Sequence, residues 1–194
     1  MFEIIHARWS RAIRRPLKWA VSRRLIRHQD GTTTVEFAMV AAPLLAMMFA
    51  TIETAVVFFA GQALETAGAA SARLIMTGQA QTQGFDQAKF KQAVCAKIYG
   101  LFNCSASLYV DVKNYSSFAA INTAKPLDAG GNLQTGTFGY APGGPGDIVV
   151  VRLMYEGPVY VSLLGLNMAD SAGSKRLLMS TNAFRNEPYV ASGP

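Results

Sequence analysis

Residues 31–60 read GTTTVEFAMVAAPLLAMMFATIETAVVFFA, and this stretch decides the architecture of the chain. No charged side chain occurs between Glu36 and Glu53. A helix needs about 20 predominantly apolar residues to cross a bilayer, and residues 37–59 satisfy this if Glu53 lies near one interface, where water reaches it. A rise of 1.5 Å per residue places the two glutamates about 25 Å apart, close to the ~30 Å thickness of the hydrocarbon core. The sequence therefore predicts a single membrane-spanning helix.

The excess positive charge of the chain lies on one side of this helix. The 194 residues carry a net charge of +6, and residues 1–31 supply all of it, with eight arginines and lysines against Glu3 and Asp30. Because basic residues flank the cytoplasmic end of a membrane helix, we expect the N-terminal segment in the cytoplasm and the C-terminal body in the periplasm. This distribution accounts for the charge without a nucleic-acid partner.

Composition excludes several classes of function. Hydrophobic residues make up 51% of the chain, which excludes chain-wide disorder. The two histidines, His6 and His28, both precede residue 31. The body therefore lacks the histidine of a Ser-His-Asp triad or a multi-histidine metal site, and we expect no enzymatic activity, metal or cofactor. Calcium at Asp128, Asn132 and Asp147 is disfavoured, because these residues lack the spacing of a calcium-binding loop.

The apolar stretch admits three interpretations. The first is a secretory signal peptide cut near residues 67–69, but the stretch is longer than the 7–15 apolar residues of such a signal. The second is a plain signal anchor that is never cleaved. The third rests on residues 30–37, DGTTTVEF, where a basic leader ends at Gly31 and Glu36 lies five residues beyond it.

The third interpretation is favoured, because residues 30–37 resemble the class III signal of type IV pilins. The resemblance implies that a prepilin peptidase cuts after Gly31, ahead of Thr32, and that the apolar helix follows from Phe37. Glycine suits a protease site because it has no side chain and accepts extended conformations. Glu36 is costly in hydrocarbon, and a new amine at Thr32 would lie one helical turn away as its partner. The alternative is that Gly31 merely starts the helix and Glu36 lies at the headgroups.

Two further features of the helix bear on assembly. Pro43 removes one backbone hydrogen bond and is expected to kink the helix, either for assembly or as a tolerated irregularity. The helix is expected to continue to residue 76, with a narrow stripe at Ala63, Ala67, Ala70 and Leu74. Small residues let a second backbone approach closely. We expect the stripe to dock on the protein's own domain, with packing against neighbouring helices as the alternative.

The segments GTTTVEFAMVAAPLLAMMFATIE (31–53) and GQALETAGAASARL (61–74) resemble the N-terminal region of TadE-like proteins, the pseudopilins of the tight-adherence (Tad/Flp) pilus machinery. GDIVVVRLMYEGPVY (146–160) and LLMSTNAFRNEPY (177–189) resemble the family's late strands and its closing R-N-E-P segment. The resemblance implies a single-pass bacterial inner-membrane protein that is matured by a prepilin peptidase and assists pilus assembly. The implied partners are that peptidase, other pilin or pseudopilin subunits, Tad assembly proteins and membrane lipid.

The rest of the sequence predicts an α+β body, in which a long helix and a shorter one pack on a small antiparallel sheet. The expected elements are a polar linker at 77–84, an amphipathic helix at 85–102, strands at 107–115, 148–155 and 175–184, and an irregular Gly/Pro-rich loop at 126–147. The apolar face of the amphipathic helix is expected to contain Phe85, Ala88, Val94, Cys95, Ile98, Leu101 and Phe102.

Cys95 and Cys104 are the only cysteines of the chain. Their spacing does not match a C-x-x-C metal or redox pair, and in an oxidising compartment they can close a loop. We therefore expect a disulfide if the body is periplasmic. The alternative is one buried cysteine and one free thiol.

The predicted organisation is a cytoplasmic leader at 1–31 that is cleaved, a transmembrane and continuing helix at 32–76, and a periplasmic domain at 77–194. The favoured function is a structural pseudopilin or assembly factor of a Tad/Flp-type pilus. The alternative is an unprocessed, membrane-anchored periplasmic binding or scaffold module. The sequence leaves open whether the protein enters the filament, caps its tip or stays in the membrane.

Overall fold

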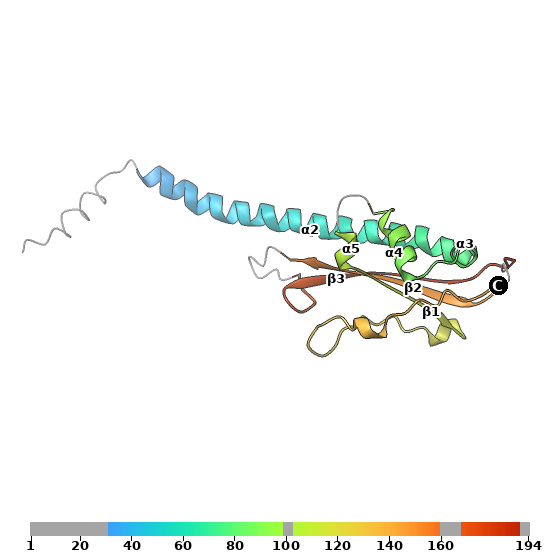
Figure 1. Cartoon of the computed structure of the whole chain (residues 1–194). Helices are drawn as coiled ribbons and strands as arrows, with labels where there is room; N and C mark the ends of the chain where they lie inside the picture. Colours follow the sequence, from blue (N-terminus) through green and yellow to red (C-terminus); the bar gives the residue numbers. More distant parts are fainter. Residues whose placement is uncertain (1–30, 99–102, 160–167, 191–194) are drawn as a thin grey trace, which may run out of the picture. The chain divides into compact units, whose positions relative to one another are not determined.

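A computed structural model describes residues 31–98, 103–159 and 168–190. The chain divides into two compact units, residues 1–45 and 46–194. The predicted leader at 1–31 lies almost wholly outside the described residues, which begin at Gly31. The main helix, α2 (Thr32–Met76), begins in the first unit and ends in the second (Figure 1).

The described part of the first unit consists of the beginning of α2. None of residues 31–45 is buried within the protein. The helical assignment continues through Pro43 without a break. Threonines 32–34 start the helix, and the alanine, leucine and methionine residues that follow have good helix propensity.

The second unit contains a three-stranded antiparallel sheet in the order β1-β2-β3 (Figure 1). Its strands are β1 (Leu108–Tyr115), β2 (Ile148–Pro158) and β3 (Lys175–Arg185). Val151, in the middle of the central strand, pairs with Val112 on one side and with Asn182 on the other. The strands predicted at 107–115, 148–155 and 175–184 are therefore confirmed, and the last two extend one to three residues further.

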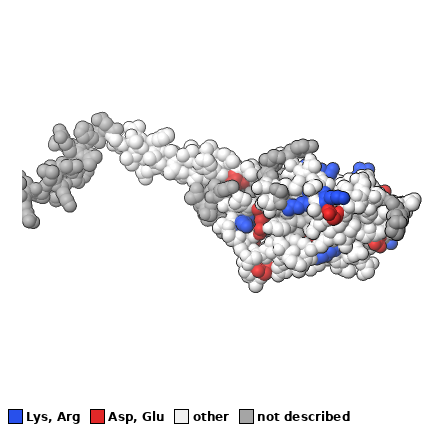
Figure 2. Space-filling model, viewed as in Figure 1, with Lys and Arg blue, Asp and Glu red and all other residues white. Residues whose placement is uncertain are grey.

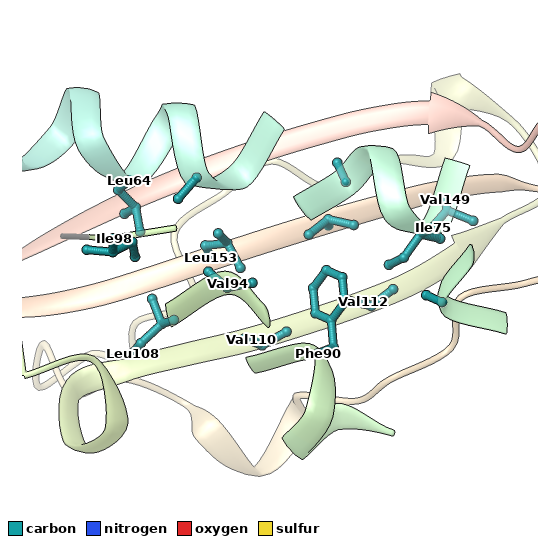
Figure 3. Packing of buried hydrophobic residues seen from close by; sticks show 14 residues of the cluster. Leu64, Ile75, Phe90, Val94, Ile98, Leu108, Val110, Val112, Val149 and Leu153 are labelled. Atoms are coloured by element: carbon teal, nitrogen blue, oxygen red, sulfur yellow. The ribbon is translucent and has the colours of Figure 1, made fainter. Parts of the chain in front are cut away.

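The core lies between one face of this sheet and the helices of the second unit. Alternate residues of a strand point to the same face, so the apolar residues at 108, 110 and 112 of β1 and at 149, 151 and 153 of β2 form one surface. Helix α2 contributes Leu64 and Ile75, and α4 (Gln87–Cys95) contributes Phe90 and Val94 (Figure 3). Together they form one cluster of side chains that are at most 9% exposed. This arrangement confirms the α+β fold class.

Residues 116–147 hold two 3-10 turns, η2 (Phe118–Ala120) and η3 (Thr135–Thr137), and no long element. Tyr140 forms an isolated parallel bridge with Val112 at the outer edge of β1. The Val112 N–H donates to the Gly139 carbonyl and the Ala141 N–H donates to the Val112 carbonyl, both over 2.8 Å. The glycine- and proline-rich loop is therefore irregular, as expected, but it protects one sheet edge.

Two expectations about the short elements need correction. The supposed linker at 77–84 contains a helical turn, α3 (Gln79–Thr82), whose Ala80 is fully buried. The amphipathic helix predicted at 85–102 is only nine residues long, because α4 begins at Gln87, after the N-cap Asp86, and ends at Cys95. Its predicted apolar face omitted Phe90, which is buried, and included Ala88, which is exposed. Leu101 and Phe102 lie outside the described residues.

Candidate functional site

The residues predicted for processing lie at the exposed start of α2. Gly31 immediately precedes the helix, and a Cβ added there would meet nothing within 4 Å. Thr32 is the first residue of α2, and Glu36 follows one turn later. The side chains of Thr32, Glu36 and Phe37 are all exposed, Phe37 by 73%. The predicted cut and the predicted charge pair therefore lie on one accessible turn, and both stay predictions.

The first part of α2 is an uncovered apolar rod. No residue between Thr32 and Phe49 is buried, and the first buried position is Ala50. Eighteen residues of helix extend about 27 Å, close to the ~30 Å hydrocarbon core of a bilayer. Among the described residues, α2 is the one helix that is long and apolar enough to cross a membrane. Its kink at Pro43 stays a prediction.

The environment of Glu53 differs from the one expected. Its side chain is only 9% exposed and lies on the face of α2 that is covered by the second unit. The expectation that water reaches Glu53 is therefore wrong. The physical reason is that the folded unit begins to cover α2 at Ala50, three residues before the glutamate. The part of the helix that is uncovered on all sides therefore ends at Phe49, about ten residues before residue 59.

Between Ala50 and Ala60, one face of α2 is covered and the other remains apolar and exposed. The exposed apolar side chains are Ile52, Val56, Phe58 and Phe59, with exposures of 51–69%. Figure 2 shows that the visible charged side chains lie over the second unit, while the visible surface of the first part of α2 is uncharged. This part of α2 therefore presents a hydrophobic face to lipid or to another helix.

Further along α2, the small residues allow close packing on β3. Gly68 is buried, and a Cβ at that position would be 2.5 Å from the Ser180 hydroxyl and 2.9 Å from the Asn182 amide nitrogen. Ala67 is also buried, but Ala70 is exposed. The predicted docking on the protein's own domain is therefore observed, but the buried face is rotated from the predicted stripe. The positions that contact the domain include Leu64, Gly68, Ser71, Ala72 and Ile75.

Cys95 and Cys104 form a disulfide with a Cα–Cα distance of 5.7 Å. Cys95 is the last residue of α4, and Cys104 is the first residue of the short helix α5 (Cys104–Ser107), which leads directly into β1. The bond therefore joins the end of a core helix to the beginning of an edge strand. Its formation in the cell stays a prediction, because it depends on an oxidising compartment.

A cluster near the end of α2, which the sequence analysis did not identify, is built around the last described residues. Asn186 is 3% exposed, and its side-chain amide donates to the carbonyls of Pro142 and Gly144, both over 2.9 Å. The backbone N–H of Glu187 donates to the carbonyl of Met76, at the C-terminal end of α2. We call residues 186–189 the C-terminal clasp, because they fasten the glycine-rich loop to the end of α2.

Gly78 and Gln81 complete the attachment of this clasp. Tyr189 packs on Gly78, which has a positive φ of 76°, and its hydroxyl donates to the Gly143 carbonyl over 3.4 Å. The side-chain amide of Gln81 donates to the carbonyls of Ile75 and Pro142 over 3.2 and 3.1 Å. The signal in the sequence was the closing R-N-E-P-Y motif itself, whose asparagine and tyrosine have structural roles here.

The acidic residues considered for calcium have other partners. The Asp128 carboxylate accepts hydrogen bonds from the backbone N–H groups of Asn132 and Gly130, both over 2.8 Å, and these bonds, with the Asn132 amide, lower its pKa. Asp147 instead accepts from the backbone N–H of Gly144. No group of three potential metal-ligating side chains occurs within the described part of the chain. Asp128 and Asp147 therefore each stabilise a local turn.

The fold and the exposed helix define a class of protein: an α+β domain carried on a long helix whose first part is an apolar rod. Residues 31–73, which form most of that helix, match the family model described as TadE-like protein. The resemblance seen in the sequence is thus confirmed for this segment, and a TadE-like segment supports a component associated with a Tad-type pilus. Comparisons with curated proteins and with solved structures give no match.

Proposed function

We propose that the protein is a pseudopilin that acts as a structural component or assembly factor of a Tad/Flp-type pilus. The observation that carries this proposal is the coincidence of the TadE-like match at 31–73 with a helix whose first 18 residues leave no side chain buried. Such a helix must be covered by lipid or by other apolar helices, since isolated exposed apolar patches of this size are rare on soluble proteins. A structural role in the membrane and in a helical assembly meets this requirement without catalysis.

In the proposed topology, residues before Gly31 lie in the cytoplasm and the second unit lies in the periplasm of the inner membrane. The excess of arginine and lysine before the helix supports this orientation. A reporter that is active only in the periplasm should be active when fused after Pro194. Activity of a cytoplasm-only reporter at the same position would reverse the assignment.

The proposed maturation step is cleavage by a prepilin peptidase between Gly31 and Thr32. In cells with an active peptidase, the purified protein should be about 3.8 kDa lighter than the 20.9 kDa full chain and should start at Thr32. Gly31→Leu should block the cut without affecting the fold, because a Cβ added at this position would meet nothing within 4 Å. Thr33→Ser should be processed normally as the matched control. Full-length mass in the wild type would support the alternative, an unprocessed anchored scaffold.

After cleavage, the proposed role of Glu36 is to pair with the amine of Thr32, in its own chain or in a neighbouring subunit. Pairing between chains would fix the axial offset of adjacent helices, because only one register neutralises both charges. Glu36→Gln should leave processing and membrane insertion intact and reduce co-purification of pilin-like subunits and surface piliation. Glu65→Gln, at another exposed position of α2, is the control. Normal piliation with Glu36→Ala would reduce Glu36 to an interfacial residue.

A further inference from the structure

Among the residues that the structure describes, the outer edge of β3 is open along its middle. Successive residues of a strand direct their backbone N–H and C=O groups to alternate sides. Lys175 and Leu177 direct theirs away from β2: the Lys175 carbonyl accepts from the N–H groups of Asp170 and Ser171, and the Leu177 N–H donates to the Asp170 carboxylate over 2.7 Å. Residues 170 and 171, which precede β3, thus cover the first part of this edge.

Further along β3, the same alternation directs the backbone groups of Met179, Thr181 and Ala183 outward. Within the described ranges 31–98, 103–159 and 168–190, these outward groups form no hydrogen bond with protein. Ala183 is exposed, and Met179 and Thr181 are half-buried. Three successive outward donor–acceptor pairs are therefore available to another strand.

The middle of this edge lacks the usual protections. Proteins block exposed edge strands with prolines, inward charges or bulges, because such edges pair with other chains. Residues 177–184 read LLMSTNAF and contain no charge, proline or glycine. The opposite edge, at Val112 of β1, is covered by the bridge to Tyr140. The two edges of one sheet thus differ in that only the β1 edge is paired at its centre.

A groove accompanies the open edge. Its volume is about 310 Å3, and it is lined by residues 182–184 of β3 and by Ala69, Ala72, Arg73 and Met76 of α2. Ala69 and Ala72 have small side chains, so the side chains of an added strand have space between α2 and the edge of the sheet. A strand paired to Met179, Thr181 and Ala183 would therefore lie next to Arg73.

Arg73 is the one charged residue among the described residues that line the groove. Arg73 is exposed and has no salt-bridge partner among the described residues. On β3, Arg176 and Arg185 donate to the backbone carbonyls of Met168 and Gly146 instead of to carboxylates. β3 itself contains three cations and no anion. A second copy pairing through β3 would bring like charges together, whereas an acidic strand would complement them.

We propose that β3 accepts an extended acidic segment of a partner protein as a fourth strand, with a carboxylate of that segment beside Arg73. Backbone hydrogen bonds to residues 179, 181 and 183 provide the affinity, and the groove and Arg73 provide the selectivity. The site is on the second unit and requires neither cleavage at Gly31 nor a role in a pilus. It is therefore tested separately from the proposed function.

The test uses the full-length protein in detergent and two soluble ten-residue peptides of alternating valine and threonine. One peptide carries two glutamates and the other carries two lysines at the same positions. Binding is measured by fluorescence anisotropy, and the site is located by amide hydrogen exchange. The glutamate peptide should slow exchange of the amides of Met179, Thr181 and Ala183 by about tenfold, equivalent to ~1.4 kcal/mol. The lysine peptide should leave their exchange unchanged.

Two pairs of variants separate the backbone from the charge. Ala183→Pro removes an N–H group that points outward and breaks no hydrogen bond to β2. This variant should abolish the protection of the β3 amides from exchange by the glutamate peptide, whereas Ala183→Ser should retain that protection. Arg73→Glu should lower the affinity for the glutamate peptide by about five- to tenfold, and Arg73→Lys should retain that affinity. Arg73 is exposed, so its variants keep the test decisive if the proline variant fails to fold. Equal binding of both peptides, absence of protection, or edge protection that rises with protein concentration alone would overturn the proposal, the last by identifying a second copy as the occupant.

Discussion

The ring of Tyr189 lies directly over Gly78, at the point where the chain leaves α2. A Cβ added to Gly78 would be 2.3 Å from Cγ of that ring, and the backbone φ of 76° is itself unfavourable for other residues. The glycine thus serves two purposes, the turn and the close approach. Removing it should loosen the C-terminal clasp at its contact with the helix.

The first prediction is that Gly78→Ala lowers the free energy of unfolding by at least about 2 kcal/mol, since backbone strain and overpacking add. Gly84→Ala is the matched control, because Gly84 also has a positive φ, 60°, but a Cβ there meets nothing within 4 Å. For Gly84→Ala, the free energy of unfolding should fall only by the part that comes from backbone strain. Thermal unfolding of the full-length protein in detergent measures both variants, and equal losses would show that Tyr189 does not occupy the space above Gly78.

The second prediction concerns the buried ion pair that fastens residues 116–147 to the sheet. The Asp111 carboxylate is 1% exposed and accepts from Nε of Arg152 over 3.1 Å, from Nη2 of Arg152, and from the N–H of Gly139 over 3.0 Å. Asp111→Asn leaves the Arg152 charge buried without an anion and should cost about 3–5 kcal/mol of unfolding free energy.

Lys113→Ala is the control for this pair. Lys113 is 3.4 Å from Asp111, but its side chain is 36% exposed, so its loss should cost less than about 1 kcal/mol. If Asp111→Asn does not fold, the double variant Asp111→Val, Arg152→Met should fold, because it leaves no unpaired charge. Chemical denaturation of the variants gives the comparison, and a small loss for Asp111→Asn would contradict a structural role for the pair.

The third prediction is an alkaline loss of stability caused by Tyr140. Burial, assisted by the negative charge of Asp86, raises the pKa of Tyr140 from 10.0 to about 12. Between pH 10 and about 12 the unfolded chain loses this proton while the folded protein keeps it, so stability falls as the pH rises. Tyr140→Phe should remove this part of the pH dependence, whereas Tyr109→Phe should leave it.

The same substitution should also raise stability at neutral pH. The Tyr140 hydroxyl is buried without a hydrogen-bond partner in the described part of the chain, while its ring packs 5.6 Å from that of Phe90. Tyr140→Phe keeps the ring contact and removes the unsatisfied hydroxyl, with an expected gain of about 1 kcal/mol. A loss of stability at pH 7 would show that the hydroxyl is satisfied, for example by water.

The fourth prediction is that Cys95 and Cys104 are bonded in the protein purified from the envelope. Unfolded, unreduced protein should bind no alkylating reagent, and reduced protein should bind two. The ring closed by the bond is short, so Cys95→Ser should cost about 2–3 kcal/mol on the chain-entropy model. The double variant Cys95→Ser, Cys104→Ser should lose no more stability than either single variant. Two reactive thiols before reduction would exclude the bond.

The sequence predicted those elements whose residues show a period. The alternation in residues 107–115 and the apolar run at 148–155 predicted strands, and both are present as β1 and β2. It did not predict the length of α4, because the helix stops at Cys95 for a tertiary reason, the disulfide and the turn into residues 96–98. Phe90 was missed although it precedes Val94 and Ile98 by four and eight residues, the helical spacing of one face, and is buried with both in the core.

The chemistry of the candidate site at Gly31, Thr32 and Glu36 stays a prediction from the motif. The structure adds that this turn is exposed. The burial of Glu53 was missed because it depends on where the domain begins to cover α2, and a local hydropathy pattern carries no information about tertiary contacts. The open edge of β3 was missed for the same reason, since strand order is a property of the whole sheet.

The clasp also has a consequence for the timing of synthesis. The end of α2 is held by the Glu187 N–H on Met76 and by Tyr189 over Gly78, contacts that join segments about 110 residues apart. A ribosome that adds about 5–20 residues per second needs several seconds or more to deliver the second partner after the first. The helix is therefore complete well before its end can be fastened, and until β1 and β2 have been synthesised Leu64 and Ile75 lack the strands that cover them. We expect the factor that receives the nascent chain to shield these apolar side chains until the strands can cover them.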